Sequence, residues 1–325
     1  MELPAALRRA VDEALEGIPL GDLSRAAAAL TARYRGEVRD GRFHLADDLT
    51  ARAYLAARLP ATFAAVSACL AAVAERRPDF APMTMLEAGA GPGTGLWAAA
   101  TRWPGIERAV AVEGSAAIRR YGEKFSKMLA AATEWRAADF DHMASERAQL
   151  VLLSYVLDEL DEPARARLVE RLWNATEDVL VIVEPGRPAG WQRILAARDQ
   201  LIAAGAHLLA PCPHAATCPL VAPDWCHFVR RVPRARIHRL AKAAAVPWED
   251  EKFIYIAASR RPGTAVEARI VGPKQAASGK ATLKLCRHDG TAATIVITRR
   301  DGDAFKIARR ADWGDALPPG STPRR

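Results

Sequence analysis

A glycine-rich turn from Glu87 to Gly95 holds the first residues whose types and spacing suit ligand chemistry. It reads Glu-Ala-Gly-Ala-Gly-Pro-Gly-Thr-Gly. Glycines let the backbone turn sharply and approach a ligand closely, and the amides that open the following helix are hydrogen-bond donors. A dinucleotide fingerprint, Gly-x-Gly-x-x-Gly counted from Gly89, would need its third glycine at the sixth place, where the sequence has Thr94. The turn therefore departs from the dinucleotide-binding pattern.

Two acidic residues follow the turn at positions where an adenosine-containing ligand would need them. Glu113 ends the second predicted strand, 24 residues after Gly89, where a carboxylate can accept both ribose hydroxyls. Asp139, after the third predicted strand, is placed to reach an adenine amino group, although an Asp there is equally typical of a turn. A plain turn with a surface Glu113 is the alternative. Together these features resemble motif I of class I methyltransferases, which implies S-adenosylmethionine bound by Glu87, Gly89, Gly91, Gly93, Glu113 and Asp139.

The sequence does not identify a catalytic residue. Amino-methylating enzymes of this class commonly carry Asn/Asp-Pro-Pro-aromatic after the fourth strand, but this chain has Ser-Tyr-Val-Leu-Asp-Glu-Leu at 154–160. A Pro-Cys pair, which would supply a nucleophile for cytosine methylation, is absent after the predicted fourth and fifth strands. Cofactor binding is therefore better supported by the sequence than catalysis.

Four of the five cysteines could form a metal site. Cys69 lies on an apolar helix face and is predicted to be a buried small hydrophobe. Cys212, Cys218 and Cys226 lie in a proline-punctuated loop, and Cys286 follows 60 residues later. Four thiolates suit an iron–sulfur cluster or a structural zinc, and zinc favours close Cys pairs, which are missing here. Four unrelated cysteines remain the alternative.

The elements that must position these residues alternate strand and helix from residue 83 onward. Short continuous apolar runs separated by helical stretches predict a parallel sheet covered on both faces, with ligands beyond the carboxyl ends of its strands. The predicted strands are residues 83–87, 109–113, 134–138, 150–154, 179–183 and 252–257. The predicted fold class is α/β, a Rossmann-like class I methyltransferase fold with a mostly parallel seven-stranded sheet.

Smaller regions flank this predicted sheet. Helical spacing of apolar residues predicts an N-terminal helical region at 1–77. The methyltransferase-like domain is expected at 78–261, with a cysteine-containing insertion at 211–227. A small basic β domain is expected at 262–317, with a frayed tail at 318–325. Its predicted strands are 266–271, 281–286, 294–298 and 304–307.

Charge is distributed unevenly along the 325 residues. The net charge is +8, but from residue 227 to the end there are 21 Lys and Arg against 9 Asp and Glu. Such a basic region favours a polyanion, nucleic acid above all, over the alternative of a solvated basic surface. No apolar run reaches the roughly 18 residues that span a bilayer, so no membrane partner is expected. The N-terminus lacks the pattern of a secretory signal, and heavy use of Ala and Arg is typical of a cytoplasmic protein from a high-GC bacterium.

Four stretches together resemble a known family. They are residues 53–62, the turn at 87–95, residues 154–160 and residues 308–315. As a set they are similar to bacterial relatives of methyltransferase-like protein seventeen, the family that includes mitochondrial ribosomal small-subunit protein twenty-two. The resemblance implies small-subunit rRNA as partner, a role in ribosome assembly or translation, and a 4Fe-4S cluster on Cys212, Cys218, Cys226 and Cys286.

Two functions follow as hypotheses. The first is an S-adenosylmethionine-dependent methyltransferase acting on small-subunit rRNA. The alternative is a non-catalytic, cofactor-binding assembly factor that clamps rRNA with its basic β domain. Both imply a ribosome-associated monomer that does not act on DNA.

Overall fold

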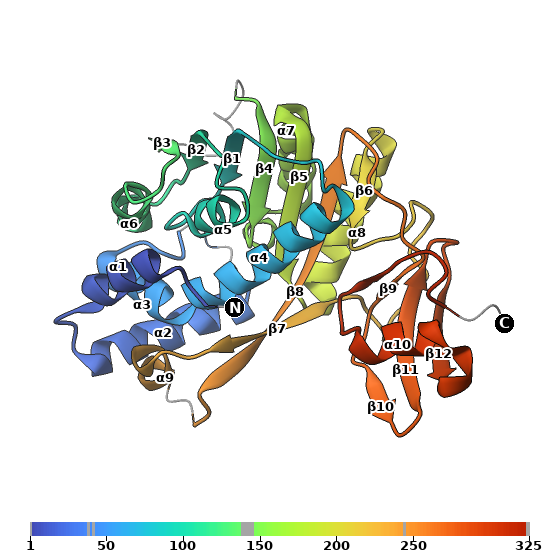
Figure 1. Ribbon diagram of the computed structural model, residues 1–325. Helices are drawn as coiled ribbons and strands as arrows, with labels where there is room; N and C mark the ends of the chain where they lie inside the picture. Colours follow the sequence, from blue (N-terminus) through green and yellow to red (C-terminus); the bar gives the residue numbers. More distant parts are fainter. Residues whose placement is uncertain (1, 38–39, 41–42, 138–145, 243–244, 323–325) are drawn as a thin grey trace.

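The computed structural model describes residues 2–37, 40, 43–137, 146–242 and 245–322. Figure 1 shows helices at the N-terminal end, a central sheet covered by helices, and a small sheet at the C-terminal end. The described chain contains two hydrophobic clusters. The larger one joins the N-terminal helices to the central sheet, and the smaller one lies within the C-terminal sheet.

The central sheet has the strand order β3-β2-β1-β4-β5-β8-β6, with β7 pairing to β8. Strand β8 is antiparallel to both β5 and β6, whereas β1 to β5 are parallel. The strands are β1 (Thr84–Ala88), β2 (Arg108–Val112), β3 (Ala132–Arg136), β4 (Ala148–Ser154), β5 (Thr176–Pro185), β6 (His207–Ala210), β7 (Phe228–Pro233) and β8 (Trp248–Ser259). The predicted α/β fold with a mostly parallel sheet is confirmed, and so are all six predicted strands. The sheet has eight strands in the described part of the chain, because β7 adds to the seven of the main path.

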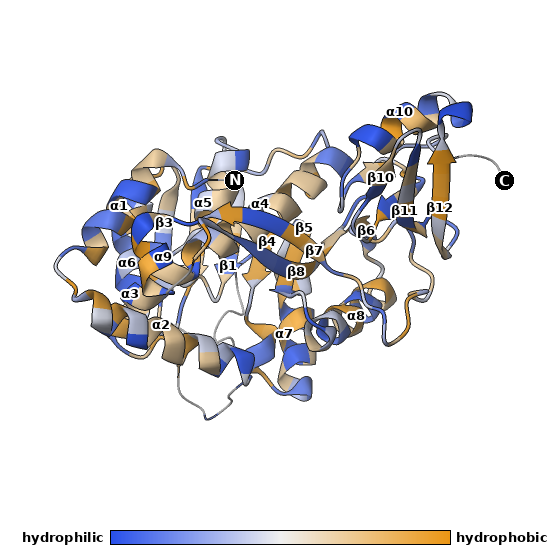
Figure 2. Cartoon of the chain, turned by 90° about the horizontal axis from the view of Figure 1, so that it is seen from below, coloured by the Kyte–Doolittle hydropathy of each residue, from blue (hydrophilic) through white to orange (hydrophobic). Residues whose placement is uncertain are grey.

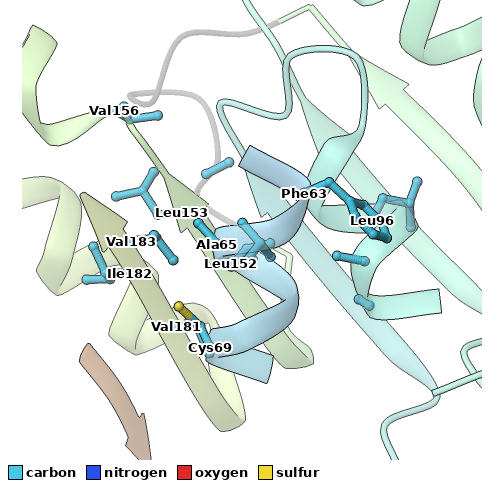
Figure 3. Packing of buried hydrophobic residues seen from close by; sticks show 14 of the residues in the cluster. Phe63, Ala65, Cys69, Leu96, Leu152, Leu153, Val156, Val181, Ile182 and Val183 are labelled. Carbon is cyan, nitrogen blue, oxygen red and sulfur yellow. The ribbon is translucent and has the colours of Figure 1, made fainter. Parts of the chain in front are cut away.

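Helices cover both faces of this sheet. Helix α4 contacts β5 and β8 on one face, and α7 and α8 pack on the other. Figure 3 shows Ala65 and Cys69 of α4 lying against Leu152 and Val181 of the sheet. The helices are α1 (Ala5–Leu15), α2 (Leu20–Arg35), α3 (Asp48–Ala57), α4 (Leu59–Arg76), α5 (Thr94–Arg102), α6 (Ala116–Ser126), η2 (Leu157–Glu159, a 3-10 turn), α7 (Glu162–Ala175), α8 (Pro188–Ala203) and α9 (Arg236–Ala241). The predicted N-terminal helices and the buried Cys69 are confirmed.

Helix α4 is long and apolar enough to cross a membrane by length and composition alone. Its apolar character has a different explanation here, because 67% of this 18-residue helix is buried inside the protein. The helix lies between the central sheet and α5 and α3. A core helix of this kind is hydrophobic all round because neighbours cover it on several sides.

The C-terminal sheet is antiparallel and carries one helix. Its elements are β9 (Ala268–Ile270), β10 (Gln275–Ala277), β11 (Lys280–Arg287), β12 (Ala292–Thr298), η3 (Arg299–Asp301), α10 (Asp303–Arg310) and β13 (Ala316–Leu317). Figure 2 shows β12 as a hydrophobic strand and α10 as a mixture of hydrophilic and hydrophobic residues. The predicted strands at 266–271, 281–286 and 294–298 are confirmed as β9, β11 and β12.

The strand predicted at 304–307 is wrong, because these residues lie in α10. Phe305 and Ala308, three residues apart, are the buried positions of this helix. A run of four residues is too short for its period to separate a helix from a strand. The frayed tail predicted at 318–325 is wrong for its described part, since Ser321 is 1% exposed and its backbone N–H donates to Glu267 Oε2 at 2.9 Å. Residues 323–325 lie outside the described residues.

Candidate functional site

A cavity of about 500 Å³ lies beyond the carboxyl ends of the parallel strands. Its lining includes Gly89 and Gly91 after β1, and the last residue of each of β2, β4 and β5 together with the loop that follows it, at residues 112–115, 154–156 and 185–187. Ligands bind at this edge of open α/β sheets because the strand order reverses there. The reversal in this sheet falls between β1 and β4.

The glycine turn joins β1 to α5 as predicted. Gly89, Gly91 and Gly93 have φ values of +62°, +54° and +77°. Side chains other than that of glycine rarely tolerate this region, so the spacing of the three glycines follows from the backbone path. Gly89 and Gly91 line the cavity, whereas Gly93 lies against the Trp135 ring.

Glu87 lies behind the turn and is not part of the cavity lining. Its Oε1 accepts from the Gly95 N–H at 2.9 Å and its Oε2 from the Leu96 N–H at 2.8 Å. Burial raises the pKa of Glu87 to about 8, and the two N–H donors only partly oppose that rise. The structure thus places Glu87 where it holds the start of α5 in position relative to the glycine turn.

Glu113 lines the cavity together with Gly114 and Ser115. Its Oε2 accepts from the Gly91 N–H at 2.8 Å and its Oε1 from the Ser115 N–H at 2.7 Å. A carboxylate offers about four lone-pair positions, so each oxygen can still accept one hydroxyl. Burial raises the pKa of Glu113, and the backbone donors oppose this rise. Asp139, the third acid in the prediction, lies outside the described residues.

Residues from the N-terminal helices complete the cavity, and sequence reasoning did not find them. Tyr34 of α2, His44 before α3, and Tyr54 of α3 all line it. His44 is buried, its Nδ1 accepts from Arg33 Nε at 3.1 Å, and burial lowers its pKa. These residues lie some 50 positions or more before the turn at the carboxyl end of β2 that they face, so no local motif links them.

A hydrogen-bonded group made by Arg58, Tyr155 and Glu251 also lines the cavity. The Tyr155 hydroxyl donates to Glu251 Oε1 at 3.0 Å, and Arg58 donates to both carboxylate oxygens at 3.1 and 3.3 Å. Tyr155, directly after β4, has a φ of +58°. Such a backbone costs a non-glycine residue about 1 kcal/mol or more and is found disproportionately at functional sites. Tyr155, from the predicted stretch 154–160, therefore lies in one hydrogen-bonded group with Arg58 and Glu251, which are distant from it in sequence.

The four predicted metal ligands come together around a second cavity, of about 30 Å³. Its lining includes Cys212, Cys218, Cys226 and Cys286, and the Cys286 Sγ lies 3.4 Å from His214 Nε2. Burial raises the pKa of Cys286 to about 12 and that of Cys212 and Cys226 above the ordinary thiol value. Within the described residues, no group of three or more His, Cys, Asp or Glu side chains is arranged to hold a single metal ion.

Two buried arginines flank this cysteine cavity. Arg198 and Arg269 are each 1% exposed. Arg198 donates to the carbonyls of His214 and Ala216 at 3.1 and 2.6 Å. Arg269 donates to the carbonyls of Pro211 and Gly314 at 3.1 and 2.8 Å. Their positive charges lower the pKa of nearby thiols, although burial has the larger and opposite effect.

The strand order, the glycine turn after β1 and the acid after β2 define this protein as one with a class I methyltransferase fold. Within that class, residues 48–318 match the family described as "Mitochondrial small ribosomal subunit Rsm22". The chain belongs to this family.

A human relative is the mitochondrial ribosome assembly protein METTL17. It is 32% identical over 289 residues, which cover 82% of this chain and 62% of the human protein. The bacterial origin and cytoplasmic location expected from composition remain predictions, since this relative is mitochondrial.

Solved methyltransferase structures show lower similarity. Magnesium protoporphyrin IX methyltransferase from Synechocystis PCC 6803, with bound SAM, is 12% identical and has a TM-score of 0.41, covering 62% of this chain and 80% of its own. Precorrin-6y C5,15-methyltransferase from Geobacter metallireducens is 12% identical with a TM-score of 0.39, covering 59% and 85%. These scores are low, so the assignment of class rests on the strand order and the turn.

Proposed function

We propose that this protein binds S-adenosylmethionine in the 500 Å³ cavity and acts in assembly of the small ribosomal subunit, with its rRNA as partner. The observation that carries the first part is the bond between Glu113 and the Gly91 N–H. It brings the ribose-binding carboxylate next to the turn that must approach the methionine part. In this proposal Gly89 and Gly91 face the ligand, while Glu87 and Gly93 hold the turn. Asp139 is the proposed contact to the adenine amino group.

Calorimetry with S-adenosylmethionine tests the cofactor site. Glu113→Gln leaves one acceptor in place of a carboxylate, and hydrogen bonds to charged groups contribute about 1.5–3 kcal/mol each. We expect affinity to fall by roughly 10- to 100-fold. Glu107→Gln is a matched control, because Glu107 is exposed and precedes the opposite end of the same strand. Wild-type protein that gives no binding heat would contradict the cofactor assignment.

The small ribosomal subunit is proposed as the partner on two grounds, the family and the positive charge of the region after residue 226. The family description names the mitochondrial small ribosomal subunit, and the human relative is named as a ribosome assembly protein. The 21 Lys and Arg against 9 Asp and Glu after residue 226 supply positive charge for phosphates. A ribosome-associated monomer without a DNA partner remains part of this proposal.

Methyl transfer to rRNA is the leading activity, and a non-catalytic clamp is the second candidate. The sulfonium of the cofactor supplies the driving force, so the chain needs mainly to position donor and acceptor. The second candidate is favoured by Glu251, whose two carboxylate oxygens already accept hydrogen bonds from Arg58 and Tyr155. Incubation with labelled cofactor and immature small subunits separates the two. Label in rRNA supports transfer, and bound cofactor without transfer supports the clamp.

We also propose that Cys212, Cys218, Cys226 and Cys286 hold a 4Fe-4S cluster, with zinc as the alternative. The four thiols line one cavity without being gathered for a single ion. A cluster takes its four thiolates on separate irons, so the wider spacing suits it better than zinc. Arg198 and Arg269 would offset the negative charge of the thiolates.

Anaerobic purification tests this site. We expect a brown protein with iron and sulfide in equal amounts. Cys286→Ser should lower the iron content, loosen the C-terminal sheet to protease and weaken RNA binding, whereas Cys69→Ala, which changes the fifth cysteine, should keep the iron. A colourless protein with stoichiometric zinc would contradict the cluster.

A further inference from the structure

A two-stranded arm projects from the central sheet beside the cofactor cavity. We call β7, α9 and the first half of β8 the basic arm; its described residues are 228–242 and 245–252. Residues 253–259 of β8 pair with β5, whereas residues 248–252 pair only with β7. Because β8 runs antiparallel to β5, its first half extends past the carboxyl ends of the parallel strands. Figure 1 shows this extension reaching α9 and the N-terminal helices.

The basic arm carries a dense positive charge. Between residues 228 and 242 there are six Lys and Arg and no Asp or Glu. Glu249 of β8 binds Arg234 and Lys242 at 3.2 and 2.7 Å. Arg236 and Arg239 are exposed, and within the described residues their side chains make no hydrogen bond or ion pair. These two cations are therefore available to an anionic partner.

An exposed aromatic ring lies on the same arm. Trp248 is 41% exposed, and the Arg231 guanidinium lies 5.4 Å from its ring centroid. Asp250 holds Arg231 by two hydrogen bonds of 2.8 and 3.0 Å. The ring is thus supported on one side by a fixed cation, and it offers a flat surface for stacking.

The arm leads directly into the cofactor cavity. Lys242 and residues 249–252 line that cavity, and α9 packs against α2 and α3, which cover it. A chain lying over Arg236, Arg239 and Trp248 would therefore end at the cavity mouth.

We propose that the basic arm binds single-stranded RNA, with phosphates on Arg236 and Arg239 and one base stacked on Trp248. The proposal rests on the proposed function, which supplies rRNA as the partner class. Single strands are favoured because only an unpaired base can stack on an aromatic ring, and because such stacking tolerates any base. Duplex RNA would offer the arginines its phosphates but would offer Trp248 no base face. The arm would thus direct an unpaired nucleotide toward the cofactor.

Fluorescence anisotropy with a labelled 12-nucleotide single strand, and with the same sequence as a duplex, tests this surface in the 325-residue chain. Removing a stacking ring weakens binding by about 5- to 150-fold. We expect that loss for Trp248→Ala on the single strand, with the duplex nearly unaffected and Trp248→Phe within a few-fold of wild type. Arg236→Gln/Arg239→Gln should reduce the slope of log affinity against log salt by about 1.4, since each single-strand phosphate contact contributes about 0.7. The matched control Arg9→Gln/Arg167→Gln changes two exposed arginines elsewhere and should leave the slope unchanged.

Three outcomes would overturn the proposal, and each bears differently on the proposed function. If the arm variants bind the single strand as tightly as wild type does, RNA remains the partner but the arm is not its site. If they bind naked RNA normally yet lose purified small subunits, the arm contacts a ribosomal protein. If wild-type protein binds neither RNA, the arm proposal and the rRNA partner fail together, while calorimetry with the cofactor still decides the cavity.

Discussion

At the scale of single residues, acids in this protein act mainly by organising backbone. Glu87 accepts two N–H groups at the start of α5, and Glu113 accepts one from the glycine turn and one from Ser115. Glu184 is fully buried and binds the Leu157 N–H and Arg193. These carboxylates fix the loops that follow β1, β2 and β4. The positions of Gly91 and Tyr155, which line the cavity, therefore depend on the hydrogen bonds that these carboxylates accept.

Glu87 should make the stability of the protein depend on pH. Burial raises its pKa to about 8 from an ordinary 4.5, so folding favours the neutral carboxyl. Its contribution is fully present below about pH 4.5 and is lost as pH rises through 8, by at most about 5 kcal/mol. Urea denaturation at pH 5, 7 and 9 should show wild type losing more free energy of unfolding than Glu87→Gln. Parallel curves for the two proteins would contradict the assignment.

Whether a cavity residue could be predicted from the sequence depends on how far along the chain it lies from the glycine turn. The glycine turn and Glu113 could be found because a strand, a turn and the next strand lie close together in the chain. Tyr34, His44 and Glu251 could not, because their approach to the cavity depends on how α2, α3 and β8 pack. The four cysteines were grouped by the resemblance and their loop, and the structure places all four around one cavity.

At the scale of elements, close packing between β5 and α8 fixes the position of residues 185–187, which line the cavity. Helix α8 begins soon after β5, and a Cβ on Gly190 would lie 2.0 Å from the Pro185 carbonyl oxygen.

Strands β4 and β5 were predictable from continuous apolar runs because both faces are buried. Strands β6 and β7 were missed, since β6 has four residues and β7 carries Arg230 and Arg231. Both strands pair with β8, so their formation depends on that strand rather than on an apolar pattern in their own residues.

Gly190→Ala should therefore destabilise the protein. The new methyl group must displace α8 from the end of β5, and overpacking of this kind costs about 1–3 kcal/mol. Gly105→Ala is the control, because a Cβ there meets no atom within 4 Å. Urea denaturation should show a lower midpoint for Gly190→Ala alone. Equal midpoints would mean that α8 can shift without cost.

At the scale of the whole molecule, Arg269 joins three regions. It lies on β9 of the small sheet, donates to Pro211 of the cysteine loop and Gly314 near the C-terminus, and lies 3.9 Å from Glu75 of α4. Its guanidinium is one of the largest fully buried groups in the described chain. The position of the small sheet relative to the body therefore depends on this side chain as well as on the cysteines.

Arg269→Met should loosen that junction. Two buried carbonyls would lose their donors, at about 1–3 kcal/mol each. We expect faster cleavage between the body and the small sheet by a protease that cuts only after Glu, whose sites are the same in both proteins, together with a lower unfolding midpoint. Arg300→Met, at an exposed position of the same region, should leave both unchanged. A protease pattern identical to wild type would show that the cysteine loop alone holds the sheet.

The continuous strand β8 has a consequence for how two ligands would act together. One half of this strand belongs to the basic arm, and the other half is hydrogen-bonded beside β5. The two ladders meet at Phe253, so a molecule seated on the arm would alter, through this one strand, the shape that a small ligand meets at the sheet edge. Thermodynamic reciprocity then requires each occupant to change the other's dissociation constant by an equal factor.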